Sequence, residues 1–177
     1  VAQAAREANV PTFILGAGAN ILVGDKGIRG FVIDLSELNA ISILDDAIVA
    51  EAGVRIDALC DAAATASLSG LEFIAGMPGS VGGALYMNAR CYDKSVSDVL
   101  DWVETVSEDG ISTRHPKNPA EWNYKKSPFQ AGSAIITRAR FLLAPGEEGQ
   151  IRSEMNTKRA DREEKGHYRF PCAGSIF

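Results

Sequence analysis

The first part of the chain alternates helical and strand patterns around a glycine-rich turn. Apolar residues in segment 1–8 recur at helical spacing and the pattern stops at Pro11, which predicts a short helix. "TFIL" at 12–15 then predicts a strand, and "GFVIDL" at 30–35 predicts a second, buried strand. Between the two lies the turn "GAGAN" at 16–20, which leads into the apolar "ILV". We therefore expect a helix, a strand, a glycine turn and a further strand in that order.

Antiparallel hairpins dominate the pattern after this point. Apolar runs flank Asp45-Asp46, and apolar–polar alternation flanks Asp109-Gly110, so each pair of runs predicts a hairpin. We also expect an amphipathic helix at 55–67, a strand at 133–143 and a charged helix at roughly 148–164. Early alternation followed by hairpins predicts an α+β architecture with two small sheet-containing lobes, rather than a doubly wound parallel sheet.

Composition narrows the function classes. The 177 residues, 46% hydrophobic and 23% charged, are typical of a soluble protein with one or two small domains. The net charge of −5 argues against a broad nucleic-acid surface, although a small anionic ligand remains compatible with it. No apolar run of about 20 residues and no leader pattern occurs, so no membrane partner is expected. Cys60, Cys91 and Cys172 lack Cys-x-x-Cys spacing, so we expect no metal site and reduced thiols in a cytoplasmic protein.

Two glycine-rich turns are the main candidates for a binding site, "GAGAN" at 16–20 and "GMPGSVGG" at 76–83. The first fails the dinucleotide pattern because Ile21 replaces its third glycine, and the second lacks the lysine of a phosphate loop. Successive N–H groups in such turns can still form a concave anion site that would suit a pyrophosphate. The alternative is that both are simply tight turns. Asn20 and Asn88 each end a glycine-rich run, as ligands or as turn-stabilising side chains, and Asn20 is the better ligand candidate.

Two further segments carry polar side chains of chemical interest. "NYKKSPFQ" at 123–130 places Lys125 and Lys126 in a short expected loop, where solvated surface lysines are the ordinary interpretation. "PCAGSIF" carries Ser175, and no histidine close in sequence suggests a Ser-His-Asp arrangement. Surface or loop roles are expected for His115 and His167.

Four ordered blocks resemble one known family. "FILGAGANILV", "GLEFIAGMPGSVGGALYMNA", "YKKSPF" and "PCAGSIF" are similar to motifs of the UDP-N-acetylenolpyruvoylglucosamine reductase (MurB) family, from about 13 to 177. The resemblance implies a two-subdomain FAD-binding module of the PCMH/VAO type (p-cresol methylhydroxylase, vanillyl-alcohol oxidase) over 1–144, with subdomains at roughly 1–40 and 41–144. Residues 145–177 would begin a separate α+β substrate-binding domain. It also implies that the opening strands of the flavin domain and the end of the substrate domain are missing.

The same resemblance implies an activity and a set of site residues. The family reduces UDP-N-acetylglucosamine enolpyruvate to UDP-N-acetylmuramate for peptidoglycan, with NADPH as co-substrate and, as expected here, non-covalent FAD. By motif position, Ser175 would protonate C2 of the substrate, and Lys125 would stabilise its carboxylate, with Lys126 as the fallback. The implied FAD-binding residues are Gly16, Ala17, Gly18, Ala19, Asn20, Ile21, Leu22, Gly76, Met77, Pro78, Gly79, Ser80, Gly82, Gly83, Ala84 and Asn88.

The chain departs from the family pattern in several places. Lys125 stands where the family usually has arginine, which exchanges a planar fork for a point charge. Arg90, Cys91 and Asp93 replace small residues near the flavin segment, and could reshape the rim of the pocket. The family's catalytic glutamate is expected beyond 177, so the 177 residues alone are expected to be inactive. Two rival hypotheses are another FAD-dependent oxidoreductase with the same fold and a non-catalytic flavin-binding module; the sequence favours no oligomeric state.

Overall fold

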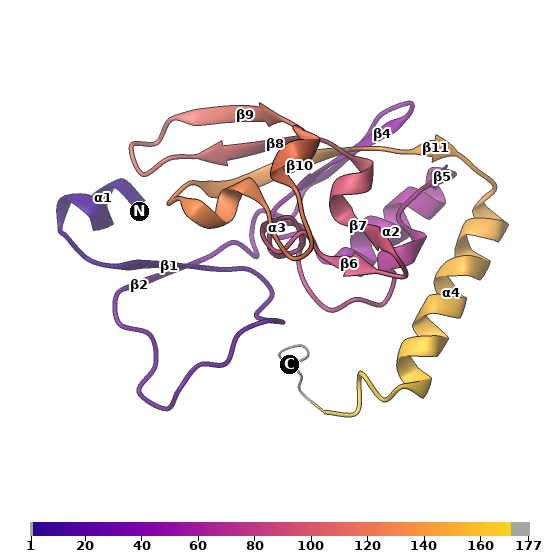
Figure 1. The fold of residues 1–177 in the computed structure, drawn as a ribbon, viewed down its shortest axis with the longest axis horizontal. Helices are drawn as coiled ribbons and strands as arrows, with labels where there is room; N and C mark the ends of the chain where they lie inside the picture. The colour runs from indigo at the N-terminus through magenta and orange to yellow at the C-terminus, as the bar shows by residue number, and fades with distance from the viewer. Residues whose placement is uncertain (1, 171–177) are drawn as a thin grey trace.

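A computed structural model describes residues 2–170 (Figure 1), so Ser175 and Cys172 lie outside the described residues. The helices are α1 (Ala2–Glu7), α2 (Ile56–Thr65), α3 (Val81–Tyr86) and α4 (Glu148–Glu164), with 3₁₀ turns η1 (Glu72–Ile74), η2 (Val96–Val99), η3 (Pro119–Glu121) and η4 (Pro128–Ala131). The strands are β1 (Thr12–Leu15), β2 (Phe31–Asp34), β3 (Ile41–Ile43), β4 (Ala47–Glu51), β5 (Leu68–Ser69), β6 (Arg90–Cys91), β7 (Lys94–Ser95), β8 (Leu100–Val106), β9 (Ser112–Pro116), β10 (Ile135–Leu142) and β11 (Ala144–Pro145).

A five-stranded sheet in the order β3-β4-β10-β8-β9 is the largest element of the fold (Figure 1). Every neighbouring pair in this sheet is antiparallel, and β3–β4 and β8–β9 are the two predicted hairpins. Two-residue hairpin signals such as Asp109-Gly110 work because glycine adopts the positive φ that tight turns need, and Gly110 has φ +80°. The α+β prediction is therefore confirmed.

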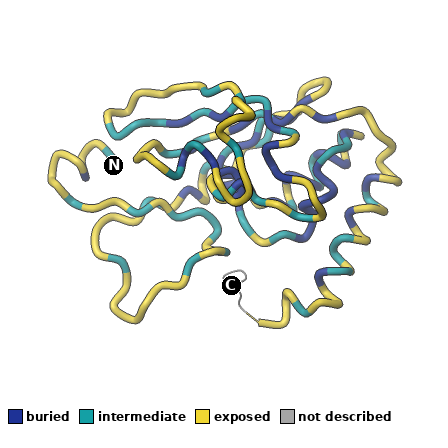
Figure 2. The backbone as a smooth tube through the Cα atoms, in the orientation of Figure 1, coloured by how far each residue is buried: buried dark blue, intermediate teal, exposed yellow. Residues whose placement is uncertain are grey.

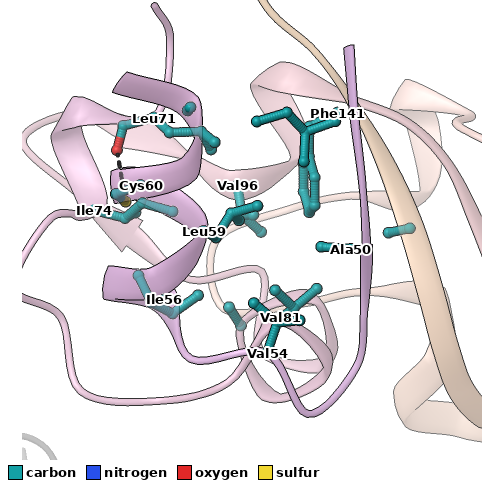
Figure 3. Packing of buried hydrophobic residues seen from close by; sticks show 14 of the residues in the cluster. Ala50, Val54, Ile56, Leu59, Cys60, Leu71, Ile74, Val81, Val96 and Phe141 are labelled. Carbon is teal, nitrogen blue, oxygen red and sulfur yellow. Dashed lines mark hydrogen bonds between the residues drawn. The ribbon is translucent and has the colours of Figure 1, made fainter. Parts of the chain in front are cut away.

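The hydrophobic core lies between this sheet and the helices that pack on it. Figure 2 shows buried backbone gathered in α2, α3, η1 and the central strands, and Figure 3 shows their side chains pointing into the shared space. Leu59, Ile74 and Phe141 are fully buried. Each such side chain contributes about 1.5–3 kcal/mol of transfer free energy. The Cys60 thiol lies in the same core and donates to the carbonyl of Leu71 at 3.4 Å, and burial raises its pKa, so it stays protonated.

The N-terminal part forms a smaller unit beside the sheet, built from α1 and the parallel pair β1–β2 (Figure 1). The strand predicted at 30–35 does form, as β2. The prediction that this strand is buried is wrong. Phe31 and Val32 are 47% and 43% exposed. The reason is that, within residues 2–170, β1 and β2 pair only with each other, which leaves part of their surface uncovered.

Helix α4 has the bounds expected from its charge pattern, and it packs on η1, α2 and β5. Ile151 and Met155 on α4 are buried in the same hydrophobic cluster as the sheet. The domain boundary near Pro145 stays a prediction, because the described part of the proposed second domain shares the core of the first.

Candidate cofactor-binding site

The two glycine-rich turns meet in the folded chain. Gly16 directly follows β1, and Ser80 directly precedes α3. A Cβ atom on Gly16 would lie 2.6 Å from the Ser80 Oγ and 4.0 Å from the backbone N of Gly83. Segments more than 60 residues apart therefore build one surface, which neither turn could form alone.

Helix α3 was not predicted, because two glycines follow Ser80 and glycine disfavours helix. Tertiary packing overrides that preference. Ser80 caps the helix by accepting a hydrogen bond from the Gly83 N at 3.4 Å, and Val81, Ala84 and Leu85 are buried. Gly82 is required by packing, since a Cβ there would lie 2.9 Å from the Cβ of Ala52.

The glycines of the two turns fall into two groups by what their bare backbone faces. Gly76 and Gly82 are covered by other protein atoms, so their lack of a side chain serves packing. Gly18 and Gly79 adopt φ of +70° and +147°, and no atom lies within 4 Å of the position a Cβ would take. These two positions leave open space in front of the backbone, as a ligand that approaches the main chain closely would need.

Free backbone donors line the same surface. Among residues 2–170, no hydrogen bond engages the N–H groups of residues 16–20, nor those of Gly79 and Ser80. The next two N–H groups are used within the fold, by Val81 to Val54 O at 2.9 Å and by Gly82 to Ala52 O at 2.8 Å. A set of unpaired N–H groups with no acidic side chain in either turn can bind anionic oxygens.

The remaining predicted flavin residues differ widely in exposure. Ala84 is buried and Met77 is half-buried, where its Sδ accepts from the Cys91 Sγ at 3.8 Å. Leu22 is 93% exposed, and Asn20 is exposed. The positions with both exposure and free donors are thus concentrated in segment 16–20 and at the partly exposed Gly79, whereas Ser80 is buried.

Asn88 is held entirely by the protein. Its Nδ2 donates to the Asn123 carbonyl at 2.8 Å, and its Oδ1 accepts from the Ser97 N at 3.3 Å. It has φ +41° and ends α3, with its own N–H bonded to Leu85 O and the next N–H to Ala84 O. This is a helix C-terminal motif in which asparagine tolerates the left-handed conformation.

We predict opposite effects for the two asparagines. Asn88→Ala should lower the free energy of unfolding by about 1–3 kcal/mol, because it leaves the buried Ser97 N–H without a partner and removes the bond to the Asn123 carbonyl. Asn20→Ala should leave the free energy of unfolding within about 0.5 kcal/mol, as expected for an exposed side chain. Urea unfolding of the two variants measures both values. Equal destabilisation by the two variants would contradict this assignment of roles.

The loop with the two lysines is fastened to the far end of α3. Ser127 donates from Oγ to the Tyr86 carbonyl at 2.8 Å, and Gln130 donates from Nε2 to the Lys125 carbonyl at 3.1 Å. Asn123 and Lys126 exchange both backbone hydrogen bonds, which makes a two-residue turn with Lys125 at φ +53°. A non-glycine residue in that conformation is strained. A six-residue helix is about 9 Å long, so the lysine loop and the glycine surface lie at opposite ends of a short, buried spacer.

The side chains of this loop are free to meet a ligand. The Lys125 Nζ lies 5.6 Å from the Tyr124 ring centroid, and Tyr124 is 70% exposed. Within the described part of the chain, neither Lys125 nor Lys126 forms a salt bridge or a side-chain hydrogen bond. The two predicted lysines therefore remain available cations, one residue apart.

Other features fall outside this surface. A hollow of about 250 Å³ is lined by β8, β9 and the 3₁₀ turns, with His115, Trp122 and Phe129 among its residues. His115 shares a hydrogen bond with the Thr105 Oγ1 at 2.9 Å and packs edge-on against Phe129. Over residues 2–170, no cluster of His, Cys, Asp or Glu has the arrangement of a metal site. Nor does any helix in that range have the length and apolar character needed to cross a bilayer.

Sequence reasoning missed the residues that hold the Gly76 corner. Arg159, Arg162 and Tyr168 reach this corner from α4 and the turn that follows it. The sequence shows these side chains only as part of a charged helix, and no local pattern links them to a glycine some 80 residues earlier. Only the folded chain shows the contact.

Comparison with known proteins agrees with the motif-based resemblance. Residues 1–114 match the family of FAD-binding domains. The chain is 43% identical to UDP-N-acetylenolpyruvoylglucosamine reductase of Treponema denticola and 38% identical to that of Staphylococcus haemolyticus, over 93% and 100% of its length. It covers only 56% and 58% of those relatives, so it spans a little over half of their length.

The fold is shared with a solved relative as well. A crystal structure of UDP-N-acetylenolpyruvylglucosamine reductase (MurB) from Thermus caldophilus matches with a TM-score of 0.80 and 34% identity, covering 98% of this chain and 63% of that one. The predicted resemblance and fold class are thereby confirmed. The chain belongs to the family of FAD-binding domains, and its closely similar relatives are the UDP-N-acetylenolpyruvoylglucosamine reductases.

Proposed function

We propose that the whole protein uses FAD and NADPH to reduce UDP-N-acetylglucosamine enolpyruvate to UDP-N-acetylmuramate, a cytoplasmic step in peptidoglycan precursor synthesis. One observation of the structure carries the cofactor part of this proposal. Two distant glycine turns converge at Gly16 and Ser80. Their free N–H groups have no partner among residues 2–170, and open space lies at the Cβ positions of Gly18 and Gly79. The substrate part is supported by the names of the relatives.

The residues present fit FAD. The N–H groups of residues 16–20 would bind the pyrophosphate, whose negative charge suits a concave set of donors. The N–H groups of Gly79 and Ser80 would donate to carbonyl oxygens of the flavin ring. Gly82 and Ala84 lie behind that surface and shape it through the packing of α3. No His or Cys occurs in either turn, which favours non-covalent binding.

Bound FAD would supply the hydride relay between NADPH and C3 of the enolpyruvyl group. The chain's own residues must then stabilise the negative charge that forms on the substrate and deliver a proton to C2. Hydride addition at C3 builds negative charge over C2 and the carboxylate, and a cation at the carboxylate stabilises that charge. Lys125 is the proposed cation, and its lack of an acidic partner among residues 2–170 leaves its charge available. Ser175 is the proposed donor of the proton to C2, which requires hydrogen-bond reach to that carbon.

The proposal is tested on the whole protein by following NADPH oxidation with and without the enolpyruvyl sugar. A flavin absorbance spectrum and oxidation stimulated by the enolpyruvyl sugar are expected. Flavin binding without that stimulation would favour another FAD-dependent oxidoreductase of the same fold. Absence of both signals would reject the proposal.

A further inference from the structure

The last described helix reaches back to the glycine surface. We infer that α4 and the turn after it position the FAD-binding segment by holding the corner 75–77 with three side chains, Arg159, Arg162 and Tyr168. We call these three residues the α4 clamp. The positioning role of the clamp rests on the proposed FAD site, whereas the contacts of the clamp are independent of that proposal.

Arg162 is the buried member of the clamp. It is 7% exposed, and its Nε donates to the Ala75 carbonyl at 3.1 Å while its Nη2 donates to the Cys91 Sγ at 3.1 Å. A buried guanidinium ordinarily pairs with a carboxylate. Over residues 2–170 no carboxylate forms a salt bridge with Arg162, so a backbone carbonyl and a thiol set its orientation. Cys91 in turn donates to the Met77 Sδ at 3.8 Å, which links Arg162 to both sides of the corner.

Tyr168 and Arg159 hold the central residue of the corner. The Tyr168 hydroxyl donates to the Gly76 carbonyl at 2.6 Å. The residue is 51% exposed, and partial desolvation of the hydroxyl raises its pKa. The Gly76 N–H donates to the Asp57 Oδ1 at 2.9 Å, and the same oxygen accepts from the Arg159 Nη2 at 2.8 Å. Arg159 also bridges to Asp61 at 3.0 Å, so its position is fixed by two carboxylates of α2. The clamp therefore bonds the Gly76 carbonyl directly, and it contacts the Gly76 N–H only through Asp57, the carboxylate that Arg159 also binds.

The glycine at position 76 is required by the same side chains. Gly76 has φ +75°, and a Cβ there would lie 2.5 Å from the Tyr168 hydroxyl oxygen and 3.1 Å from carbons of Arg159 and Arg162. All three clamp residues therefore pack against the Gly76 backbone, where a side chain would not fit. Gly76, the first glycine of the run, makes room for side chains of α4 and of the turn after it. Gly79, three residues later, faces open space.

The corner determines where the open part of the turn points. Positions 75–77 are bonded on both sides, whereas Gly79 and Ser80 have free N–H groups. Donors held in place before a ligand arrives lose less conformational entropy on binding. The family resemblance predicts that α4 begins the substrate-binding domain, and the clamp would then connect that domain directly to the flavin segment.

The test compares two clamp variants with a matched control in the whole protein. Tyr168→Phe removes one hydroxyl, and Arg162→Lys replaces a planar fork by a single amine that cannot keep both bonds. Tyr92→Phe is the control, because the Tyr92 hydroxyl also joins α4, through Asp161, but does not touch the corner. Loss of one hydrogen bond should raise the FAD dissociation constant about two- to tenfold for Tyr168→Phe, and Arg162→Lys should exceed tenfold. Tyr92→Phe should stay within about twofold.

Hydrogen exchange of the FAD-free protein provides a readout that does not depend on the cofactor. Peptides covering 72–83 should exchange faster in both clamp variants and at the wild-type rate in Tyr92→Phe. If the wild-type protein binds no FAD but exchange responds in this way, the clamp stands and the proposed function fails. Exchange at 72–83 and FAD affinity that both match the wild type in the clamp variants would overturn the inference.

Discussion

Replacing Ser175 with alanine is expected to lower the rate of product formation by about 10²- to 10⁴-fold, the usual contribution of a positioned proton donor. Hydride addition leaves negative charge at C2, and without the serine hydroxyl that carbon must take its proton from unpositioned water. Oxidation of NADPH in the absence of the sugar should stay within about twofold of wild type, because it does not involve this proton. Stopped-flow absorbance separates the two half-reactions in the whole protein.

A conservative variant provides the control for Ser175. Ser175→Cys keeps a side chain of similar size with a transferable proton and should recover part of the lost rate, whereas Ser175→Ala should not. A Ser175→Ala variant that turns over at more than half the wild-type rate would exclude this serine as the donor. Equal slowing of both half-reactions would instead indicate damage to flavin binding.

Replacing Lys125 with methionine is expected to lower kcat by about 10²- to 10³-fold, as removal of one preorganised electrostatic partner does in other enzymes. Methionine keeps the length and the strained φ of +53°, so the turn should survive while the charge is lost. The expected cause is loss of stabilisation of the charge that develops over the substrate carboxylate. Steady-state kinetics at saturating NADPH measures the effect.

The neighbouring lysine is the matched control. Lys126→Met removes an equal charge one residue away and is expected to change kcat less than about threefold, as a solvated lysine would. Lys125→Arg should retain activity, since arginine offers a planar fork to the same carboxylate. If Lys126→Met loses the activity and Lys125→Met keeps it, the role belongs to Lys126.

The sequence predicted those elements whose signals are local. The hairpin at Asp109-Gly110 and the bounds of α4 are correct because turn residues and charge pattern lie within the elements themselves. Helix α3 was missed because its stability comes from burial against the backbone of Ala52, which no local pattern reveals. The half-exposed β2 differs from the buried prediction because burial depends on the partners present, and a short apolar run does not specify them.

The candidate site shows the same division. Sequence found both glycine turns, and the structure brings them together at Gly16 and Ser80. The sequence could not show that Gly76 makes room for Tyr168 whereas Gly79 faces open space. The two glycines differ only in their tertiary neighbours. Asn88 likewise matched the ligand pattern of Asn20, but both polar ends of its side chain are used within the fold. Within a glycine-rich run, some glycines make room for other parts of the protein and others leave open space for a ligand. Only the folded structure shows which glycine does which.

The FAD dissociation constants of Gly18→Val and Gly110→Val in the whole protein test the proposed pyrophosphate turn most directly. Both glycines have positive φ, +70° and +80°, and both face open space, so the two substitutions impose similar strain. Only Gly18 lies in the proposed pyrophosphate turn. We expect saturable binding of one FAD per wild-type chain. Gly18→Val should weaken that affinity at least about tenfold, or 1.4 kcal/mol, and Gly110→Val should leave it within about twofold. No saturable binding to the wild type, or equal effects of the two substitutions, would contradict the proposed pyrophosphate turn.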